Sequence, residues 1–220
     1  MSARDRILAR LRAAPVISVP MPVAISNCFE PPAAAAALIR PFTEAMTAAH
    51  AEVHLTDRDA WPELLLRLAG EKKVGTLLIG DGAAHSVRLQ ALSPDSPRLQ
   101  VYDRPVSAWK EGLFDTVDAG FTSARCAIAE TGSLVLWPDL GEPRLLSLVP
   151  PIHFVLVDAA TLRTSLSSVM AEEGWSRGLP TNVLLISGPS KTADIQQTMA
   201  YGAHGPRELI VLLVCQESPA

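Results

Sequence analysis

From residue 51 onward, short apolar runs typical of β-strands alternate along the chain with stretches whose apolar residues have the spacing of an α-helix. Short apolar runs, typical of buried strands, occur at 53–55, 74–79 and 99–102. Segments with helical spacing lie between them, from Asp57 or Asp59 to Ala69 and over 84–91. We expect Gly70 to end the first of these helices. This alternation predicts an α/β fold, with a mainly parallel sheet flanked by helices.

The middle of the chain departs from that alternation. Apolar runs at 117–121, 126–129 and 134–137 indicate three strands with no helix between them. The last two are separated only by Glu130-Thr131-Gly132-Ser133, a short turn with glycine where positive φ is needed. We therefore expect a central β-hairpin excursion from the parallel sheet.

The C-terminal part returns to alternating elements. It is predicted to contain strands and helices in the order strand 152–157, helix from Asp158 or Thr161 to Met170, strand 183–186, helix 192–201 and strand 209–214. In parallel sheets, ligands bind beyond the carboxyl ends of the strands. Gly80-Asp81-Gly82 and Gly188-Pro189-Ser190 are both expected at such ends. No Gly-x-Gly-x-x-Gly sequence follows Gly80, which disfavours a nicotinamide-dependent enzyme.

The N-terminal third has a different composition. Residues 4–14 have the spacing of a short helix that carries four arginines, and a proline-rich segment follows before a helical stretch at 33–50. We therefore divide the chain into an N-terminal helix and proline-rich arm at 1–32 and an α/β domain at 33–220. The helix and arm could dock on a neighbour, and their reach also permits homodimerisation.

Composition narrows the classes of function. The 220-residue chain has a net charge of −4, which disfavours nucleic-acid binding, and no apolar run long enough to cross a membrane. It shows no secretory leader, so we expect a cytoplasmic protein. Its three cysteines are far apart and odd in number, which fits a reducing compartment and disfavours a metal or iron–sulfur site in this chain. Neither a metal nor a bound cofactor is predicted.

The richest candidate chemistry lies at residues 187–195. Gly188-Pro189 follows an apolar strand, and Ser190-Lys191-Thr192 opens the helix expected at 192–201. Free N–H groups at a helix start, with two hydroxyls and an ammonium, favour a phosphate or carboxylate. A simple N-cap with a solvated lysine is the alternative. Asp194 lies in the first helical turn, where an acid is favourable without any catalytic role.

Two further residues are candidates for proton transfer. His204 lies in the constrained turn Gly202-Ala203-His204-Gly205-Pro206, where an imidazole could move a proton or only stabilise the turn. Glu130 ends an apolar strand and could act as a general acid/base or nucleophile, or pair with a nearby arginine. His153 lies inside an apolar strand and is interpreted as a core histidine. Cys126 and Cys215 are interpreted as inert core residues.

Four blocks carry a resemblance to a known family. They are 127–136 (AIAETGSLVL), 148–153 (LVPPIH), 187–195 (SGPSKTADI) and 202–206 (GAHGP). In this order they resemble the lactate-utilization protein C family, or LUD domain. The resemblance implies a fold like that of CoA-transferases and ribose-5-phosphate isomerase. It also implies a role in oxidising L-lactate to pyruvate, beside partner subunits that carry iron–sulfur clusters.

The resemblance names no chemical step, so three functions stay open. The first is an accessory or ligand-binding subunit with an anion pocket. The second is an autonomous CoA-transferase-like or cyclo-ligase-like enzyme that uses Glu130, and the third is a structural adaptor for iron–sulfur partners. By position, the resemblance marks only motif residues, at 130–132, 188–194 and 204–206. From the chemistry of their side chains we take Glu130 and His204 as catalytic candidates and a further set as ligand-binding. The ligand-binding set is Gly188, Ser190, Lys191, Thr192, Asp194, Thr131, Gly132 and Gly205. We expect the loop at 187–194, the Glu130 turn and the His204 turn to converge on one pocket.

Overall fold

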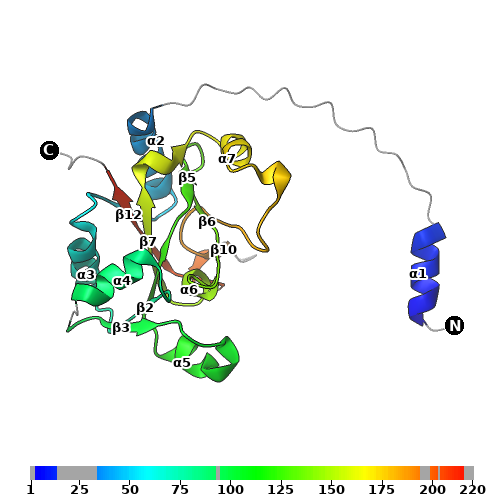
Figure 1. Ribbon diagram of the computed structural model, residues 1–220, viewed down its shortest axis with the longest axis horizontal. Coiled ribbons are helices and arrows are strands. Elements are labelled where there is room, and N and C mark those ends of the chain that lie inside the picture. The colour runs from blue at the N-terminus through cyan, green and yellow to red at the C-terminus, as the bar shows by residue number, and fades with distance from the viewer. Residues whose placement is uncertain (1–2, 14–33, 93–94, 194–198, 203, 216–220) are drawn as a thin grey trace.

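Six strands form one parallel sheet in the computed structural model, which describes residues 3–13, 34–92, 95–193, 199–202 and 204–215. Every neighbouring pair in the order β1-β12-β7-β4-β2-β3 is parallel. The strands are β1 Glu52–Thr56, β2 Thr76–Ile79, β3 Arg98–Val101, β4 Ala119–Ser123, β7 Ile152–Asp158 and β12 Glu208–Val214. The predicted α/β fold with a mainly parallel sheet is confirmed (Figure 1).

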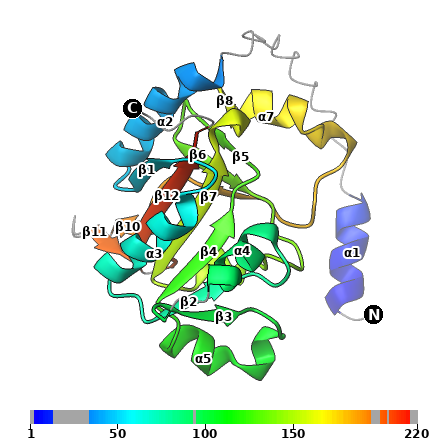
Figure 2. The ribbon, with the colours of Figure 1, turned by 60° about the vertical axis from the view of Figure 1, so that its left-hand side comes forward.

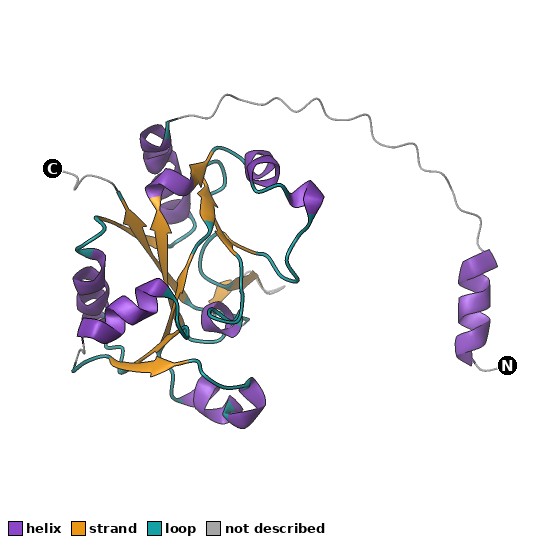
Figure 3. Cartoon of the chain, viewed as in Figure 1, coloured by secondary structure: helices purple, strands orange, loops and turns teal. Residues whose placement is uncertain are grey.

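Helices cover both faces of this sheet (Figure 3). On one face, α3 Trp61–Glu71 and α4 Ala84–Leu92 pack on side chains such as Phe154 and Leu212. On the other face lies α2 Ala35–Ala48. Because successive side chains of a strand point to opposite faces of the sheet, neighbouring residues in β7 and β12 pack into opposite layers. The sheet is therefore buried on both sides, as the continuous apolar runs predict.

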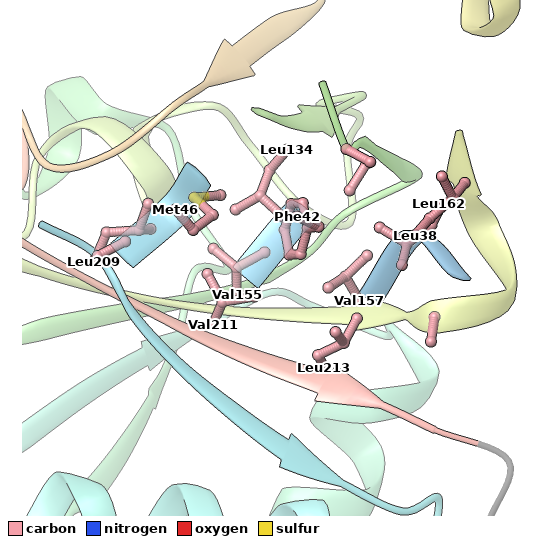
Figure 4. Close-up of a cluster of buried hydrophobic side chains, with 14 of the residues drawn as sticks. Leu38, Phe42, Met46, Leu134, Val155, Val157, Leu162, Leu209, Val211 and Leu213 are labelled. Carbon is pink, nitrogen blue, oxygen red and sulfur yellow. The ribbon is translucent and has the colours of Figure 1, made fainter. Parts of the chain in front are cut away.

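The layer under α2 is shown in Figure 4. Leu38, Phe42 and Met46 recur along one side of the helix and point at the sheet. Val155 of β7 and Val211 of β12 lie beneath them and are fully buried. Pro41 lies inside α2 on its exposed side, so the predicted helix at 33–50 forms with its proline included.

A second sheet of four strands lies over the same face, in the order β8-β5-β6-β9. Its strands are β5 Cys126–Ile128, β6 Ser133–Leu136, β8 Leu162–Arg163 and β9 Leu184–Ile186. The predicted hairpin is confirmed, since β5 and β6 are antiparallel and Gly132 has φ +57°. The expected place of β9 is wrong. It pairs antiparallel with β6 as an edge strand, and Leu185 is 46% exposed, so it is no buried strand of the parallel sheet.

The described residues of the segment 192–201 do not form the expected helix. Instead, β10 Lys191–Ala193 pairs antiparallel with β11 Met199–Tyr201. Backbone hydrogen bonds to the loop before β10 and the turn after β11 hold this hairpin, so tertiary contacts override the local helical composition. Residues 194–198 lie outside the described part of the chain.

Two helix ends also differ from the sequence prediction. Asp158 caps only the single turn Ala159–Thr161, and α7 Leu166–Glu172 starts later, where Ser165 Oγ accepts a hydrogen bond from the Ser168 N–H. Helix α3 continues past Gly70 to Glu71, and Lys73 takes the positive φ that follows it.

The remaining elements are short, apart from the N-terminal helix. They are α1 Ala3–Ala13, the 3₁₀ turns Val106–Ala108 and Trp175–Arg177, α5 Lys110–Asp115 and α6 Leu145–Leu148. Helix α1 is confirmed as a helix and stands apart from the sheets in both views (Figures 1 and 2). The domain boundary at residues 32 and 33 stays a prediction. Within the described residues, no helix has the length and apolar character needed to span a bilayer.

Candidate functional site

A cavity of about 180 Å³ lies beside the first residues of β7 and β12, at the amino edge of the parallel sheet. We call it the amino-edge cavity. Its walls are the loop 187–190 after β9, the turn 204–206 before β12, and residues of α6. His153 of β7 and Leu209 of β12 also line it. The cavity therefore lies between the two sheets, at the end opposite to the carboxyl edge expected for Gly188.

Backbone contacts hold the loop and the turn together. The Ser190 N–H donates to the Pro206 carbonyl at 2.7 Å, and the Gly202 N–H donates to the Ser190 carbonyl at 2.9 Å. A Cβ on Gly205 would lie 3.3 Å from the Ser190 Cβ, so the two segments are in close contact. Two of the three segments expected to converge therefore do so.

Gly188 fits this loop for a backbone reason. Its φ is +136°, and a Cβ there would lie 2.9 Å from the Ala49 carbonyl oxygen at the end of α2. A side chain would both strain the backbone and collide with that carbonyl. Gly188 therefore shapes the cavity wall by allowing the loop to approach α2.

The Glu130 turn reaches the cavity only through a chain of hydroxyls. Thr131 Oγ1 lies 2.7 Å from Ser133 Oγ, which lies 2.6 Å from Ser187 Oγ. Glu130 itself is exposed and is not among the described lining residues. Gly132 packs against α2, where a Cβ would lie 2.8 Å from the Ala45 Cβ. The structure thus does not bring the Glu130 carboxylate to the cavity wall, because the turn that carries Glu130 packs against α2.

The helix-start anion site expected at Ser190-Lys191-Thr192 does not form, because Lys191 begins a strand. Ser190 lines the amino-edge cavity, whereas Lys191 is exposed and outside its described lining. Asp194 lies outside the described residues, and the structure does not describe the Thr192 side chain. The anion site therefore loses its helix dipole and keeps Ser190 as a hydroxyl on the cavity wall.

His153 is buried in the core, as its place in an apolar strand predicts, and it also lines the cavity. It is fully buried, and burial lowers its pKa to about 3, so the imidazole is neutral near pH 7. Its Nε2 lies 2.9 Å from Thr122 Oγ1, and no residue that the structure describes hydrogen-bonds its Nδ1. A polar histidine in an otherwise apolar strand was the available signal.

The described lining carries hydroxyl and imidazole groups and is apolar over much of the rest of its surface. Hydroxyls come from Ser187 and Ser190, and His204 adds an exposed imidazole. Leu148 and Leu209 supply apolar surface. This combination suits a small molecule with one polar end and one apolar end, and the volume lies below the range typical of sites for drug-sized ligands.

Other candidates have structural explanations. Burial raises the pKa of the Cys126 thiol to about 11, which makes it a poor nucleophile. Burial also raises the pKa of Cys215. Among the described residues, no group of three or more His, Cys, Asp or Glu side chains is placed to hold a metal ion.

A second polar cluster, which the sequence did not reveal, lies at the opposite edge of the sheet. Glu142 Oε2 accepts a hydrogen bond from Ser123 Oγ at 2.6 Å, and Glu142 Oε1 lies 2.9 Å from His85 Nε2. The last contact is at ion-pair distance without hydrogen-bond geometry. These residues are far apart in sequence, so only the fold brings them together.

The architecture defines an α/β protein with one parallel sheet and a smaller mixed sheet. The LUD domain family model matches residues 39–214, so the chain belongs to that family. It is 37% identical to an uncharacterized protein of Neisseria meningitidis serogroup B, over 100% of this chain and 97% of that one. It is 27% identical to "Lactate utilization protein C" of Macrococcus caseolyticus, over 52% of this chain and 51% of that one. It is 33% identical to the protein of the same name from Halalkalibacterium halodurans, over 46% and 45%.

A solved structure shares the fold. The crystal structure of a DUF162 family protein from Deinococcus radiodurans superposes with a TM-score of 0.60 at 20% identity. The match covers 84% of this chain and 100% of that one. This structure confirms the α/β fold, and the family-model match confirms the family predicted from the four sequence blocks.

Proposed function

We propose that this chain takes part in lactate utilization as a ligand-binding subunit, and that the amino-edge cavity takes a small carboxylate such as lactate or pyruvate. The observation that carries the proposal is the meeting of loop 187–190 and turn 204–206 around one cavity. Relatives named for lactate utilization match about half of the chain, which supports the pathway. We place this function in the cytoplasm.

The lining groups suggest how such a molecule binds. Hydroxyls of Ser187 and Ser190 donate to carboxylate oxygens, and the exposed ammonium of Lys191 adds positive charge next to Ser190. Leu148 and Leu209 accept a methyl group. In this arrangement His204 handles a proton at the cavity mouth.

Oxidation of lactate to pyruvate releases two protons and two electrons, and the electrons must pass to an acceptor. The three cysteines are too far apart in sequence for a local cluster motif, so we propose that iron–sulfur clusters in partner subunits supply this acceptor. Helix α1 is the proposed contact, because Ile7 is 61% exposed on a helix that carries four arginines. Deletion of residues 1–32 should abolish co-purification with such partners, and retained assembly would refute this contact.

The ligand proposal is tested by thermal unfolding with L-lactate, pyruvate, phosphate, CoA, ATP and a folate. A compound present at about 100 times its Kd stabilises the protein by about 2.7 kcal/mol. We expect lactate or pyruvate to raise Tm in the wild type and in Glu130→Gln, to lose most of this effect in Ser190→Ala, and to lose a smaller part of it in Lys191→Ala. No shift with any compound would contradict a ligand-binding role and favour the adaptor function. A shift lost only in Glu130→Gln would favour the enzyme that uses Glu130.

A further inference from the structure

The parallel sheet has a point where the direction of strand addition reverses. From β2 the chain passes through α4 to β3 at one edge, whereas from β4 it proceeds to β7 and then β12 in the other direction. The adjacent strands β2 and β4 therefore send their connections to opposite sides. In open parallel sheets, ligands bind at the carboxyl ends of the two strands that flank such a reversal.

Polar side chains gather at these carboxyl ends. Ser123 is the last residue of β4, and both its N–H and its hydroxyl donate to the Glu142 carboxylate, at 2.8 and 2.6 Å. His85, at the start of α4 just after β2, places Nε2 2.9 Å from that carboxylate. The side chains of His85 and Glu142 are only 12% and 17% exposed. Ser123, Glu142 and His85 thus form one polar cluster in which the His85 and Glu142 side chains are largely shielded from solvent.

The backbone fixes the position of this cluster. A Cβ on Gly80 would lie 2.1 Å from the Gly141 carbonyl oxygen, so the loop that carries Glu142 rests directly on the end of β2. Asp139 Oδ1 accepts hydrogen bonds from the N–H groups of Gly141 and Glu142, both at 2.8 Å. Glu142 is therefore positioned before any ligand arrives.

A cleft of about 360 Å³ adjoins the cluster on the side away from β2, over the carboxyl ends of β4, β7 and β12, and Ser123 lines it. Two guanidinium groups also line it. Arg88 lies over the Trp61 ring at 5.7 Å, donates to the Asp59 carbonyl at 3.0 Å and pairs with the Asp59 carboxylate at 3.2 Å, contacts that hold it in place. Arg58 bridges to the Asp158 carboxylate at the end of β7, at 3.1 Å. We call this the carboxyl-edge cleft.

We propose that the carboxyl-edge cleft is a second binding site, distinct from the amino-edge cavity, which takes a small phosphate monoester that carries a hydroxyl group. The two guanidinium groups are paired with the Asp59 and Asp158 carboxylates. A phosphate monoester, with two negative charges and more acceptor oxygens than a carboxylate, competes for them better than a carboxylate ligand does. The cleft also has about twice the volume of the amino-edge cavity, about 360 against 180 Å³.

The hydroxyl requirement follows from the direction of the Ser123 hydrogen bond. Because its hydroxyl proton points at Glu142, Ser123 Oγ presents lone pairs to the cleft. A ligand hydroxyl can donate to Ser123 Oγ, and the hydrogen bonds then run in one direction from the ligand through Ser123 to Glu142. The phosphate and the hydroxyl are thus recognised by different residues.

The test is calorimetric titration of the full chain with three probes: glycerol 3-phosphate, methyl phosphate and inorganic phosphate. We expect glycerol 3-phosphate to bind about fivefold or more tightly than methyl phosphate, since one added hydrogen bond is worth about this factor. Arg88→Ala and Arg58→Ala should each weaken glycerol 3-phosphate about tenfold or more. Arg67→Ala, which removes an exposed arginine paired with Glu71 on α3, is the matched control and should change nothing.

Ser123→Ala separates the two parts of the proposal. It should bring the affinity for glycerol 3-phosphate down to that for methyl phosphate and leave methyl phosphate unchanged. Ser190→Ala, in the amino-edge cavity, should leave both probes unaffected. Absence of binding by all three probes would overturn the site, as would binding that is lost in Ser190→Ala and kept in Arg88→Ala. Equal affinity for glycerol 3-phosphate and methyl phosphate in the wild type would overturn the role of Ser123. None of these results depends on whether lactate binds elsewhere.

Discussion

The two edges of the parallel sheet carry sites of opposite character. The amino-edge cavity is lined by hydroxyls, imidazoles and apolar side chains, and its walls come from segments rich in glycine, proline and serine. The carboxyl-edge cleft is charged, with Arg58, Arg88 and Asp158 in its lining. The amino-edge cavity can be recognised from local sequence, because its tight turns require glycine, proline and serine. The residues of the carboxyl-edge cleft are far apart in sequence, and only the topology of the sheet brings them together.

The largest expected effect on stability comes from a substitution that disrupts only the carboxyl edge of the sheet. Gly80→Ala places a methyl group 2.1 Å from the Gly141 carbonyl oxygen. Because a backbone atom cannot move away without distorting the loop, we expect a loss of about 3 kcal/mol or more in the free energy of unfolding. Urea denaturation measures this loss. In Gly70→Ala, the control in α3, the new methyl meets nothing within 4 Å, and stability should rise by about 0.5–1 kcal/mol. A Gly80→Ala protein as stable as the wild type would show that the loop of Glu142 does not rest on β2 as described.

At the amino edge, the strongest expected effect depends on pH. The pKa of His153 is about 3 in the folded protein and near 6.5 in the unfolded chain, so below pH 6.5 the unfolded chain binds the extra proton. Stability should therefore fall as the pH drops from 6.5 toward 3. Between pH 7 and 5 we expect the wild type to lose about 2 kcal/mol more than His153→Gln does.

Urea denaturation at the two pH values checks this difference. His204→Gln, which removes an exposed imidazole from the same cavity, is the control and should follow the wild type. Identical pH dependence in the wild type and His153→Gln would contradict a buried, neutral His153.

A smaller loss of stability is expected when the hydroxyl contacts between the β5–β6 hairpin and the cavity wall are removed. Ser133 is 5% exposed and lies between Thr131 and Ser187 in the hydroxyl chain. Ser133→Ala removes both contacts, so we expect a loss of about 1–2 kcal/mol in thermal unfolding. Ser167→Ala, an exposed serine on α7, should stay within about 0.5 kcal/mol of the wild type. Equal stability of the two variants would show that the chain of hydroxyls does not couple hairpin and loop.

Much of the parallel sheet could be predicted from sequence because its strands are continuous apolar runs. The segment 152–157 is the strongest of these, and it forms the centre of the sheet as β7. The hairpin was equally readable, since Gly132 supplies the positive φ that its turn requires. Partner choice was not readable: the run at 183–186 has strand character, but its sequence does not reveal that it joins β6.

The candidate site was predicted in part. Loop 187–190 and turn 204–206 meet as expected, because their special residues serve local turns. The helix expected at 192–201 was wrong because its composition favours a helix while contacts with Ser190 hold a hairpin. Glu142 and His85 carried no sequence signal, since their proximity depends on how β2 and β4 lie side by side.

The most direct test of a lactate site at the amino edge of the sheet is hydrogen–deuterium exchange of the full chain with and without L-lactate. We expect L-lactate to slow exchange in peptides that cover 185–190 and 204–209, at the amino-edge cavity, and to leave peptides over 58–61 and 85–88 unchanged. Slowed exchange at the carboxyl-edge peptides, or no change at either edge, would contradict a lactate site at the amino edge of the sheet.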